Sequence, residues 1–324
     1  MNFDSLRSHG HSDVPLQPEW QLQIEAWRDL LAQCARKPSR RRVHALRSLT
    51  LRLRVALEYR LEQAQDATAA RAFKRWNKEG KMLRRALEPV RDADVYLARL
   101  DGLRDSLEGA PDGRPKLSPR CLREMDKLEG RLEQRRQTGI DELMAVIDAR
   151  GKRLRRLSKE MEVALAPRMS SRVLSTRQEA LRIFGELARE FPNLDSSNLH
   201  TYRKRLKQAL YLAEISATAD PLAGKLAAAL RKIHAASGEW HDWQALALEA
   251  GRTLHVQSKQ DSLVAVLETQ AEGALERVLP LCRRSAERLL KNAGEIQPSQ
   301  RRKPVAADPG YNPCDEDLAV GISS

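Results

Sequence analysis

Several features of other protein classes are scarce or missing in this sequence of 324 residues. Aromatic residues make up only 4% of the chain, so stacking platforms for single-stranded nucleic acid are few. No alternation of apolar and polar residues and no Asn-Gly turn indicates a β-hairpin. No apolar run is long enough to cross a bilayer, and the N-terminus lacks the apolar stretch of a signal peptide. We therefore expect no strand and no membrane partner.

Metal sites and phosphate-cleaving machinery are also missing. The four cysteines are scattered, no pair has metal-ligand spacing, and a chain of this size needs no disulfide. We therefore expect reduced thiols in a cytoplasmic protein. The sequence has no Gly-rich phosphate loop, no Walker-type lysine and no carboxylate cluster for Mg²⁺. We expect a protein that is not an enzyme, with no metal site and no cofactor.

Positive charge is what the sequence has in excess. Lys and Arg number 57 against 44 acidic residues, which gives a formal charge of +13. Such an excess favours a polyanionic partner, whether nucleic acid, anionic membrane or a phosphate polymer, although a merely basic soluble protein has the same balance. Leu, Ala, Arg, Glu and Lys dominate the composition, which is typical of a helical protein.

The stretch 40–58, RRRVHALRSLTLRLRVALE, concentrates this charge on one helix face. At about 100° per residue, Leu46, Leu53 and Leu57 fall on one arc and predict a buried side. His44 and the arginines fall on the other, and no acid appears before the end of the stretch. A solvated helix face normally mixes both signs, so this face predicts an anionic partner.

Breakers and apolar spacing predict the organisation of the chain. Residues 1–15 and 294–324 are polar and predict flexible tails, and Ala166-Pro167 is the best boundary between halves 16–166 and 167–293. Glu88-Pro89 and Ser237-Gly238 predict helix ends. Helices are predicted over about 16–37, 40–65, 67–87, 118–137, 141–165, 171–190, 196–217, 221–236, 240–256 and 259–292, with a further one starting at Arg91.

The stretch 40–58 has a counterpart in the second half. Leu199–Glu214 reads LHTYRKRLKQALYLAE, and setting His200 on His44 places Arg203 on Arg47. The sequence around Arg91-Asp92 is echoed around His241-Asp242. Two anchors at near-equal separation predict an internal duplication.

Four motifs together give the chain its resemblance to a known family. The helix motifs are His44, Arg47, Arg52 and Arg54, and His200, Arg203, Arg205, Lys207, Tyr211 and Glu214; the turn motifs are 91–95 (RDADV) and 238–243 (GEWHDW). Over about residues 15–293 the chain resembles the CHAD domain, the conserved-histidine α-helical domain. The chain departs from the family pattern at Leu51 and Leu210, where Arg is usual, at Glu88, where Gly is usual, and at His241, where Asn is usual.

The resemblance implies an all-α fold of two four-helix-bundle halves related by a pseudo-two-fold axis. It also implies that basic residues of both halves line a central channel that binds inorganic polyphosphate, and that the protein associates with polyphosphate granules and their proteins. No fused enzyme motif is visible, so the chain resembles a stand-alone member.

The candidate polyphosphate-binding residues are basic and come from both halves. Arg suits bidentate contact with phosphate oxygens, Lys supplies mobile charge, and histidines beside cations should be neutral donors at pH 7. The histidines could also be structural or catalytic, and Asp92 and Asp242 could cap helices or pair with cations. The candidates are His44, Arg47, Arg52, Arg54, Lys78, Lys81, Arg85, His200, Arg203, Lys204, Lys207 and Arg231.

Other functions remain open at this point. A nucleic-acid-binding helical protein fits the charge but not the lack of aromatic platforms or of a DNA-binding module. A polyphosphate hydrolase or transferase, an accessory to a polyphosphate-metabolising enzyme, and a scaffold for acidic proteins are the further alternatives. A solvated surface is the alternative for each basic face.

Overall fold

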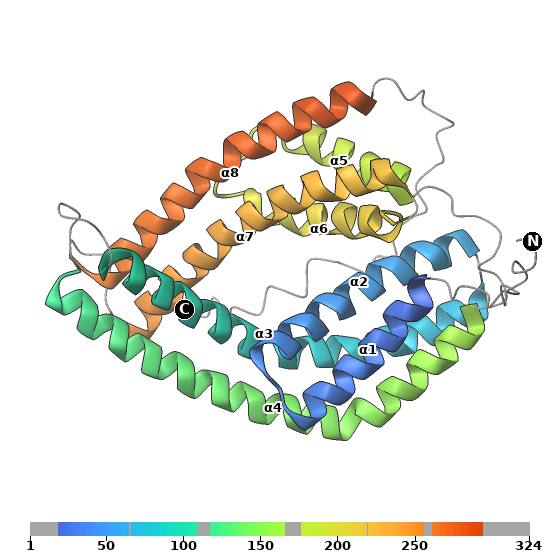
Figure 1. The fold of residues 1–324 in the computed structure, drawn as a ribbon, viewed down its shortest axis with the longest axis horizontal. Coiled ribbons are helices and arrows are strands. Elements are labelled where there is room, and N and C mark those ends of the chain that lie inside the picture. The colour runs from blue at the N-terminus through green and yellow to red at the C-terminus, as the bar shows by residue number, and fades with distance from the viewer. Residues whose placement is uncertain are drawn as a thin grey trace, which may run out of the picture. The chain divides into compact units, whose positions relative to one another are not determined.

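A computed structural model describes residues 19–64, 66–108, 117–165, 176–218, 220–255 and 261–293. Within these ranges the chain forms helices and no strand, which confirms the all-α fold class. The predicted tails and the Ala166-Pro167 boundary lie outside the described residues. The helices in Figure 1 are α1 (Glu19–Arg36), α2 (Arg40–Ala64), α3 (Ala67–Glu108), α4 (Pro119–Leu165), α5 (Thr176–Glu190), α6 (Leu199–Ile215), α7 (Pro221–Leu254) and α8 (Leu263–Ala293).

Polar residues just before several helices satisfy their first backbone N–H groups. The Asp66 carboxylate accepts from the N–H groups of Thr68 (2.7 Å) and Ala69 (3.2 Å) at the start of α3. Asp220 does the same for α7, accepting from Leu222 N at 2.9 Å, with Pro221 at the first helical position. Such caps are the local signals that mark a helix start, and these two can be recognised in the sequence.

Three predicted helix ends are wrong. Helix α3 continues through Glu88-Pro89, α4 continues through 138–140, and α7 continues through Ser237-Gly238. Three pairs of predicted helices are therefore three long helices. The pairs are 67–87 with the helix from Arg91, 118–137 with 141–165, and 221–236 with 240–256. Asp92 and Asp242 consequently lie inside helices and do not cap them.

Tertiary packing explains why these residues do not break the helices. Gly139 of α4 is buried against α3, where a β-carbon on it would lie 3.1 Å from Val90 Cγ2 and 3.4 Å from Pro89 Cβ. The missing side chain thus lets α4 approach α3 closely at the proline. Gly238 of α7 gives room to the Arg203 guanidinium, whose Nη2 would lie 3.5 Å from an added β-carbon. Contacts between helices outweigh local helix propensity at both places.

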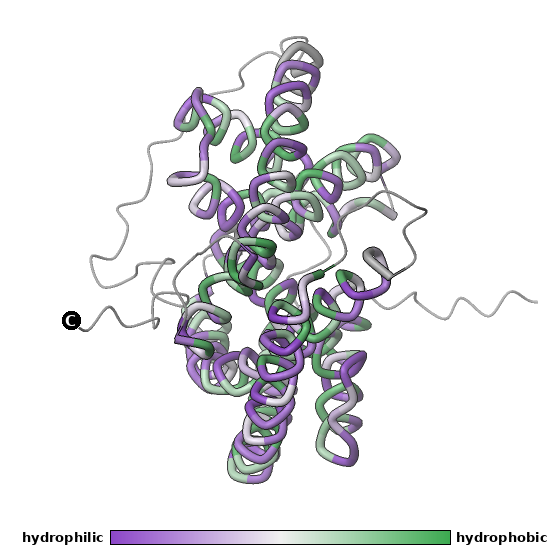
Figure 2. Tube along the Cα trace, turned by 90° about the vertical axis from the view of Figure 1, so that its left-hand side faces the viewer, coloured by the Kyte–Doolittle hydropathy of each residue, from purple (hydrophilic) through white to green (hydrophobic). Residues whose placement is uncertain are grey.

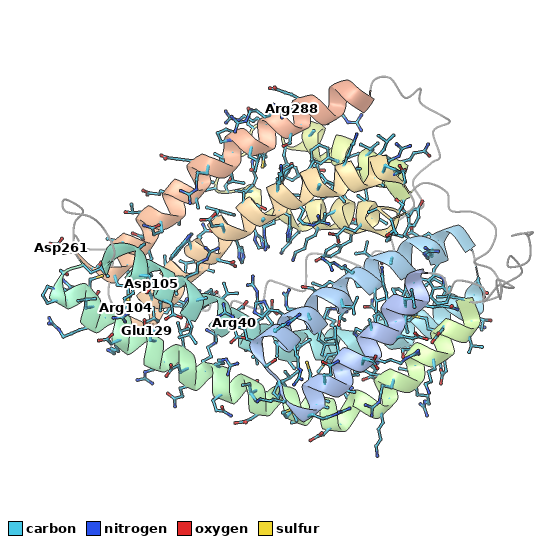
Figure 3. All side chains as sticks on the ribbon, in the orientation of Figure 1. Arg40, Arg104, Asp105, Glu129, Asp261 and Arg288 are labelled. Carbon is cyan, nitrogen blue, oxygen red and sulfur yellow. The ribbon has the colours of Figure 1, made fainter. Side chains whose placement is uncertain are left out.

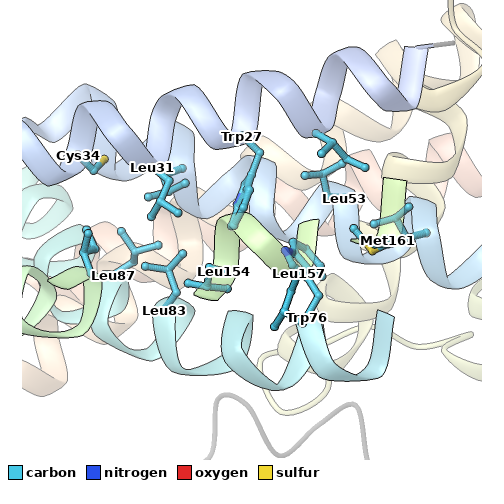
Figure 4. Packing of buried hydrophobic residues seen from close by; sticks show 14 of the residues in the cluster. Trp27, Leu31, Cys34, Leu53, Trp76, Leu83, Leu87, Leu154, Leu157 and Met161 are labelled. Carbon is cyan, nitrogen blue, oxygen red and sulfur yellow. The ribbon is translucent and has the colours of Figure 1, made fainter. Parts of the chain in front are cut away.

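Helices α1 to α4 enclose one hydrophobic core. Trp27 of α1 and Trp76 of α3 meet edge to face with ring centroids 5.5 Å apart, and both are fully buried. Leu53 of α2 and Leu157 of α4 are members of the same cluster, shown in Figure 4. Trp27 Nε1 also donates to Thr50 Oγ1 at 2.8 Å, which satisfies a buried indole. This core fixes the position of α2 and therefore of its basic face.

Helices α5 to α8 form the second consecutive set. Helix α6 contacts α5 and α7, and it buries Tyr202, Leu206 and Ala209. Helix α8 reaches α7 through an ion pair between Arg277 and Glu239 (3.0 Å). Figure 2 shows hydrophobic and hydrophilic residues alternating along the helices, as expected for amphipathic helices with one buried face. The internal duplication stays a prediction.

The two sets touch through α2 and α6, α3 and α7, and α4 and α7. All these contacts lie within one compact unit, which extends through Ala286. A second unit begins at Glu287, and its described residues are the end of α8. Ion pairs at the junction include Arg135 of α4 with Glu249 of α7 at 3.0 Å. The contact between α2 and α6 brings the two predicted basic motifs near one another.

Candidate polyanion-binding site

Helix α2 sorts its residues as the sequence predicts. Leu46, Leu53 and Leu57 are fully buried in the first core, whereas His44 and Arg47 are half-buried on another side. Arg47 donates to Glu88 of α3 at 3.2 Å. Glu88, one of the departures from the family pattern, therefore serves as an ion-pair partner of a predicted site residue.

Helix α6 carries the second basic motif. Lys204 and Lys207 are half-buried, and Arg203 is only 8% exposed with its guanidinium against Gly238 of α7. Leu210, a departure from the family pattern, is buried and contributes to packing. Arg205 pairs with Glu190 and Glu186 of α5.

A single carboxylate of α6 links predicted site residues of two other helices. Glu214 of α6 lies 3.1 Å from Arg52 Nε of α2 and accepts from Arg231 Nη2 of α7 at 2.7 Å. The Arg52 guanidinium also lies over the Tyr211 ring, 5.6 Å from its centroid. Glu214 therefore holds one cation from each set of helices in a defined position.

A second carboxylate, Asp242 of α7, holds two cations of α3. Asp242 accepts from Arg91 Nη2 at 3.1 Å and lies 3.8 Å from Arg99 Nη2. Burial alone would raise the pKa of Asp242, but the hydrogen bond to His241 and the charges of Arg91 and Arg203 lower it overall. Asp242 thus stays ionised, and it pairs with cations, one of the two predicted roles.

Several histidines lie among these cations. Burial lowers the pKa of His44, and the nearby Arg91 lowers it further, although Asp94 lies 3.9 Å from its Nε2. His200 stacks on His241 with ring centroids 5.0 Å apart. Burial, followed by the charges of Arg203 and Lys207, lowers the pKa of His234 to about 3. A histidine with so low a pKa is neutral at pH 7.

Cations from both sets of helices affect the pKa of two further groups, Tyr211 and His234. The pKa of Tyr211 is raised by burial and lowered by Arg52, Arg47 and Arg203. The pKa of His234 is lowered by burial and by Arg203, Lys207 and Arg52. Cations of α2 and α6 therefore share one neighbourhood. We define the central basic cluster as Arg47, Arg52, Arg91, Arg203 and Lys207.

The remaining predicted residues lie on the same helices outside this cluster. Arg54 is half-buried on α2, Lys78 and Arg85 are exposed on α3, and Lys81 is half-buried there. Within the described residues, the three α3 cations form no ion pair. At about 100° per residue, Lys81 lies within about 20° of Glu88, which faces Arg47. Lys81 therefore lies on the side of α3 that carries Glu88.

Sequence reasoning missed several residues of the cluster's surroundings. The sequence places Arg91 in a turn motif and not in the site, because Glu88-Pro89 predicts a helix end there. His234 lies one turn before Gly238 on α7, and its spacing of three from Arg231 is the signal that could have found it. Tyr211 and Glu214 were noted as motif residues without a role.

The described part of the chain offers no group of three His, Cys, Asp or Glu side chains able to hold a metal. Two hollows lie outside the cluster. One, of about 720 Å³, is lined by Pro89, Arg131, Arg135 and His255 among others, and the other lies between α7 and α8. No described helix is long and apolar enough to cross a membrane.

Comparison with known proteins identifies the family of the chain. A family model described as the CHAD domain matches residues 20–250, which include α2, α3, α6 and most of α7. The chain belongs to the CHAD domain family. A solved structure of PptA from Streptomyces chartreusis superposes with a TM-score of 0.54 at 14% identity, covering 85% of this chain and 99% of that one. No curated protein sequence matches. At such low identity, the likeness to PptA concerns the CHAD fold alone.

Proposed function

We propose that the central basic cluster binds inorganic polyphosphate between side chains of α2 and α6, in a channel lined by both sets of helices. The observation that carries the proposal is the link through Glu214, which holds Arg52 of α2 at 3.1 Å and Arg231 of α7 at 2.7 Å and so brings cations of both sets together. Membership of the CHAD family supports it. We also propose that the protein binds this polymer without cleaving it.

The chemistry of the cluster suits a phosphate polymer. Polyphosphate carries about one negative charge per unit along a flexible chain, so recognition requires many charge-assisted contacts in a row. Arginines supply bidentate donors and lysines supply mobile charges. Because rigid helices hold these groups, binding orders little of the protein.

Carboxylates inside the cluster set the arginines in place. Glu214 orients Arg52 and Arg231, and Asp242 orients Arg91. Each guanidinium has five donors, so a contact to one carboxylate leaves others for a phosphate oxygen. The acidic residues are therefore compatible with anion binding and reduce the entropy lost when the arginines engage the polymer.

Nucleic acid is a poorer fit for this cluster. The aromatic residues near the cluster, Tyr211 and Trp243, are only 8% and 7% exposed. Each is also covered by a guanidinium, of Arg52 and Arg99 respectively. Neither ring is open to a base, so the cluster lacks the stacking surface that single-stranded nucleic acid uses.

Titration of the protein with long-chain polyphosphate, followed by competition with duplex DNA at equal phosphate concentration, tests the proposal. We expect tight binding, weak competition by DNA and no released phosphate. Equal or tighter binding of DNA would refute the polyphosphate assignment, and phosphate release would refute a purely binding role.

Variants locate the binding site. Arg47→Gln, Arg52→Gln and Lys207→Gln together remove three charges of the cluster, from α2 and α6, and we expect binding weaker by roughly 10- to 100-fold. The matched control Lys127→Gln, Lys225→Gln and Arg284→Gln removes three exposed charges elsewhere. Equal losses in both triple variants would mean that only net charge matters. We avoid Arg203 because its burial makes folding depend on it.

In the cell, we propose association with polyphosphate granules and their proteins. An accessory role beside a polyphosphate-metabolising enzyme is the alternative. A tagged protein that stays diffuse in cells containing visible granules would contradict granule association.

A further inference from the structure

A second basic surface lies along the seam between α3 and α4. On α3, Lys74 and Lys78 are exposed one turn apart, and Arg75 lies beside them. On α4, Lys152, Arg156 and Lys159 are exposed. The two helices touch here, since Arg75 pairs with Glu160 at 3.2 Å. We define the α3–α4 seam by these six basic residues.

Acidic residues at the seam already have arginine partners. Glu79 is buried under α4 and pairs with Arg150 (2.5 Å) and Arg153 (3.2 Å). Glu160 pairs with Arg75 and with Arg156, the latter at 3.5 Å. No other acid occurs in α3 between Ala67 and Leu87. The seam therefore presents a nearly uniform positive surface.

The lysines of the seam have no such partners. Within the described residues, Lys74, Lys78, Lys152 and Lys159 form no ion pair. Lys74 with Lys78, and Lys152 with Arg156, are like-charged pairs four residues apart, a spacing that destabilises a helix. A solvated face would gain stability by mixing signs, so the uniform charge indicates a ligand.

The seam is also continuous with the central basic cluster. Lys81 and Arg85 follow Lys78 on α3, and Lys81 lies on the same side of the helix as Glu88, which pairs with Arg47 of α2. The six cations lie on the outer sides of two antiparallel helices, about 6 Å apart per turn along each helix, and the side chains of both helices are drawn in Figure 3. The six residues of the seam include no aromatic group for base stacking.

We propose that the α3–α4 seam is a second binding surface for the same phosphate polymer, so that one long chain engages the central cluster and the seam together. The inference rests on the proposed function. A chain too short to span both surfaces uses the central cluster alone. A longer chain gains from the high effective concentration of its own second segment, which raises overall affinity without a stronger individual contact.

The test compares polyphosphates of about 15 and of several hundred units by calorimetric titration at one salt concentration. The seam variant carries Lys74→Glu, Lys152→Glu and Lys159→Glu, and the control carries Lys127→Glu, Lys225→Glu and Arg284→Glu, all at exposed positions. We expect the seam variant to bind the long polymer about 10-fold or more weakly and the short one within about 2-fold of wild type, with the control within about 2-fold for both. If the reversed charges lower the urea midpoint, the same positions changed to Gln replace them.

Several results would overturn the seam assignment. They are unchanged long-chain affinity in the seam variant, equal losses for short and long chains, and equal losses in the control. Loss of binding to duplex DNA or to anionic vesicles, with polyphosphate affinity intact, would reassign the seam to another partner. If wild type binds neither polymer, the proposed function itself fails, which distinguishes the two failures.

Discussion

Buried and half-buried ionisable residues define the candidate site. Asp242 stays charged because Arg91, Arg203 and His241 surround it, whereas His234 stays neutral because it is buried beside Arg203 and Lys207. The neighbours are mainly cations in both cases, and a cation favours a charged carboxylate but disfavours a charged imidazolium. The neutral histidine adds no positive charge to a crowded set of cations.

The pKa of His234 makes the stability of the fold depend on pH. Below pH 6.5 the unfolded chain protonates this histidine, while the folded chain does not until about pH 3. Stability should therefore fall as pH drops below 6.5, by up to about 1.4 kcal/mol per pH unit. His234→Gln should remove this contribution, so urea unfolding between pH 6.5 and 5.5 should show a flatter profile than wild type. An identical slope in both proteins would contradict the burial of a neutral His234.

At the level of the helix, glycine and proline positions act through packing. Gly139 and Pro89 meet where α4 crosses α3, and the absence of a side chain on Gly139 permits that approach. Gly130 lies on the same helix but is exposed, and a β-carbon there would meet nothing within 4 Å. The two glycines therefore form a matched pair.

Gly130→Ala should stabilise the protein by up to about 1 kcal/mol, because alanine has the higher helix propensity. Gly139→Ala should lose that gain through the 3.1 Å contact with Val90 Cγ2, and it should be at least about 1 kcal/mol less stable than Gly130→Ala. Thermal or urea unfolding measures the difference. Equal stabilisation by both substitutions would mean that α3 and α4 are not in close contact here.

Helix positions could be predicted from the sequence better than helix lengths. The apolar periodicity around Leu46 and Leu53, and the cap and proline at Asp220-Pro221, depend only on nearby residues. The continuity of α3 through Pro89 and of α7 through Gly238 depends on partners distant in the sequence, Gly139 and Arg203. No local signal encodes those contacts.

For the molecule as a whole, the informative contacts are those between the two sets of helices. The sequence placed His44 with Arg47 and His200 with Arg203 on equivalent faces, and the structure brings α2 and α6 into contact. The sequence does not predict that Glu214 pairs with Arg52 and Arg231, or Asp242 with Arg91. A chain with 57 basic residues offers many possible pairs of opposite charge. Which pair forms depends on how the helices pack.

The central claim is that phosphates of one polymer contact cations on both α2 and α6. The salt dependence of polyphosphate affinity tests it most directly, because the slope of log K against log salt reports the number of neutralised phosphates. For Arg47→Gln, Arg52→Gln and Lys207→Gln combined, the account predicts a slope smaller by about two to three than in wild type, with no change in the Lys127, Lys225 and Arg284 control. A wild-type slope in the first triple variant would contradict the account.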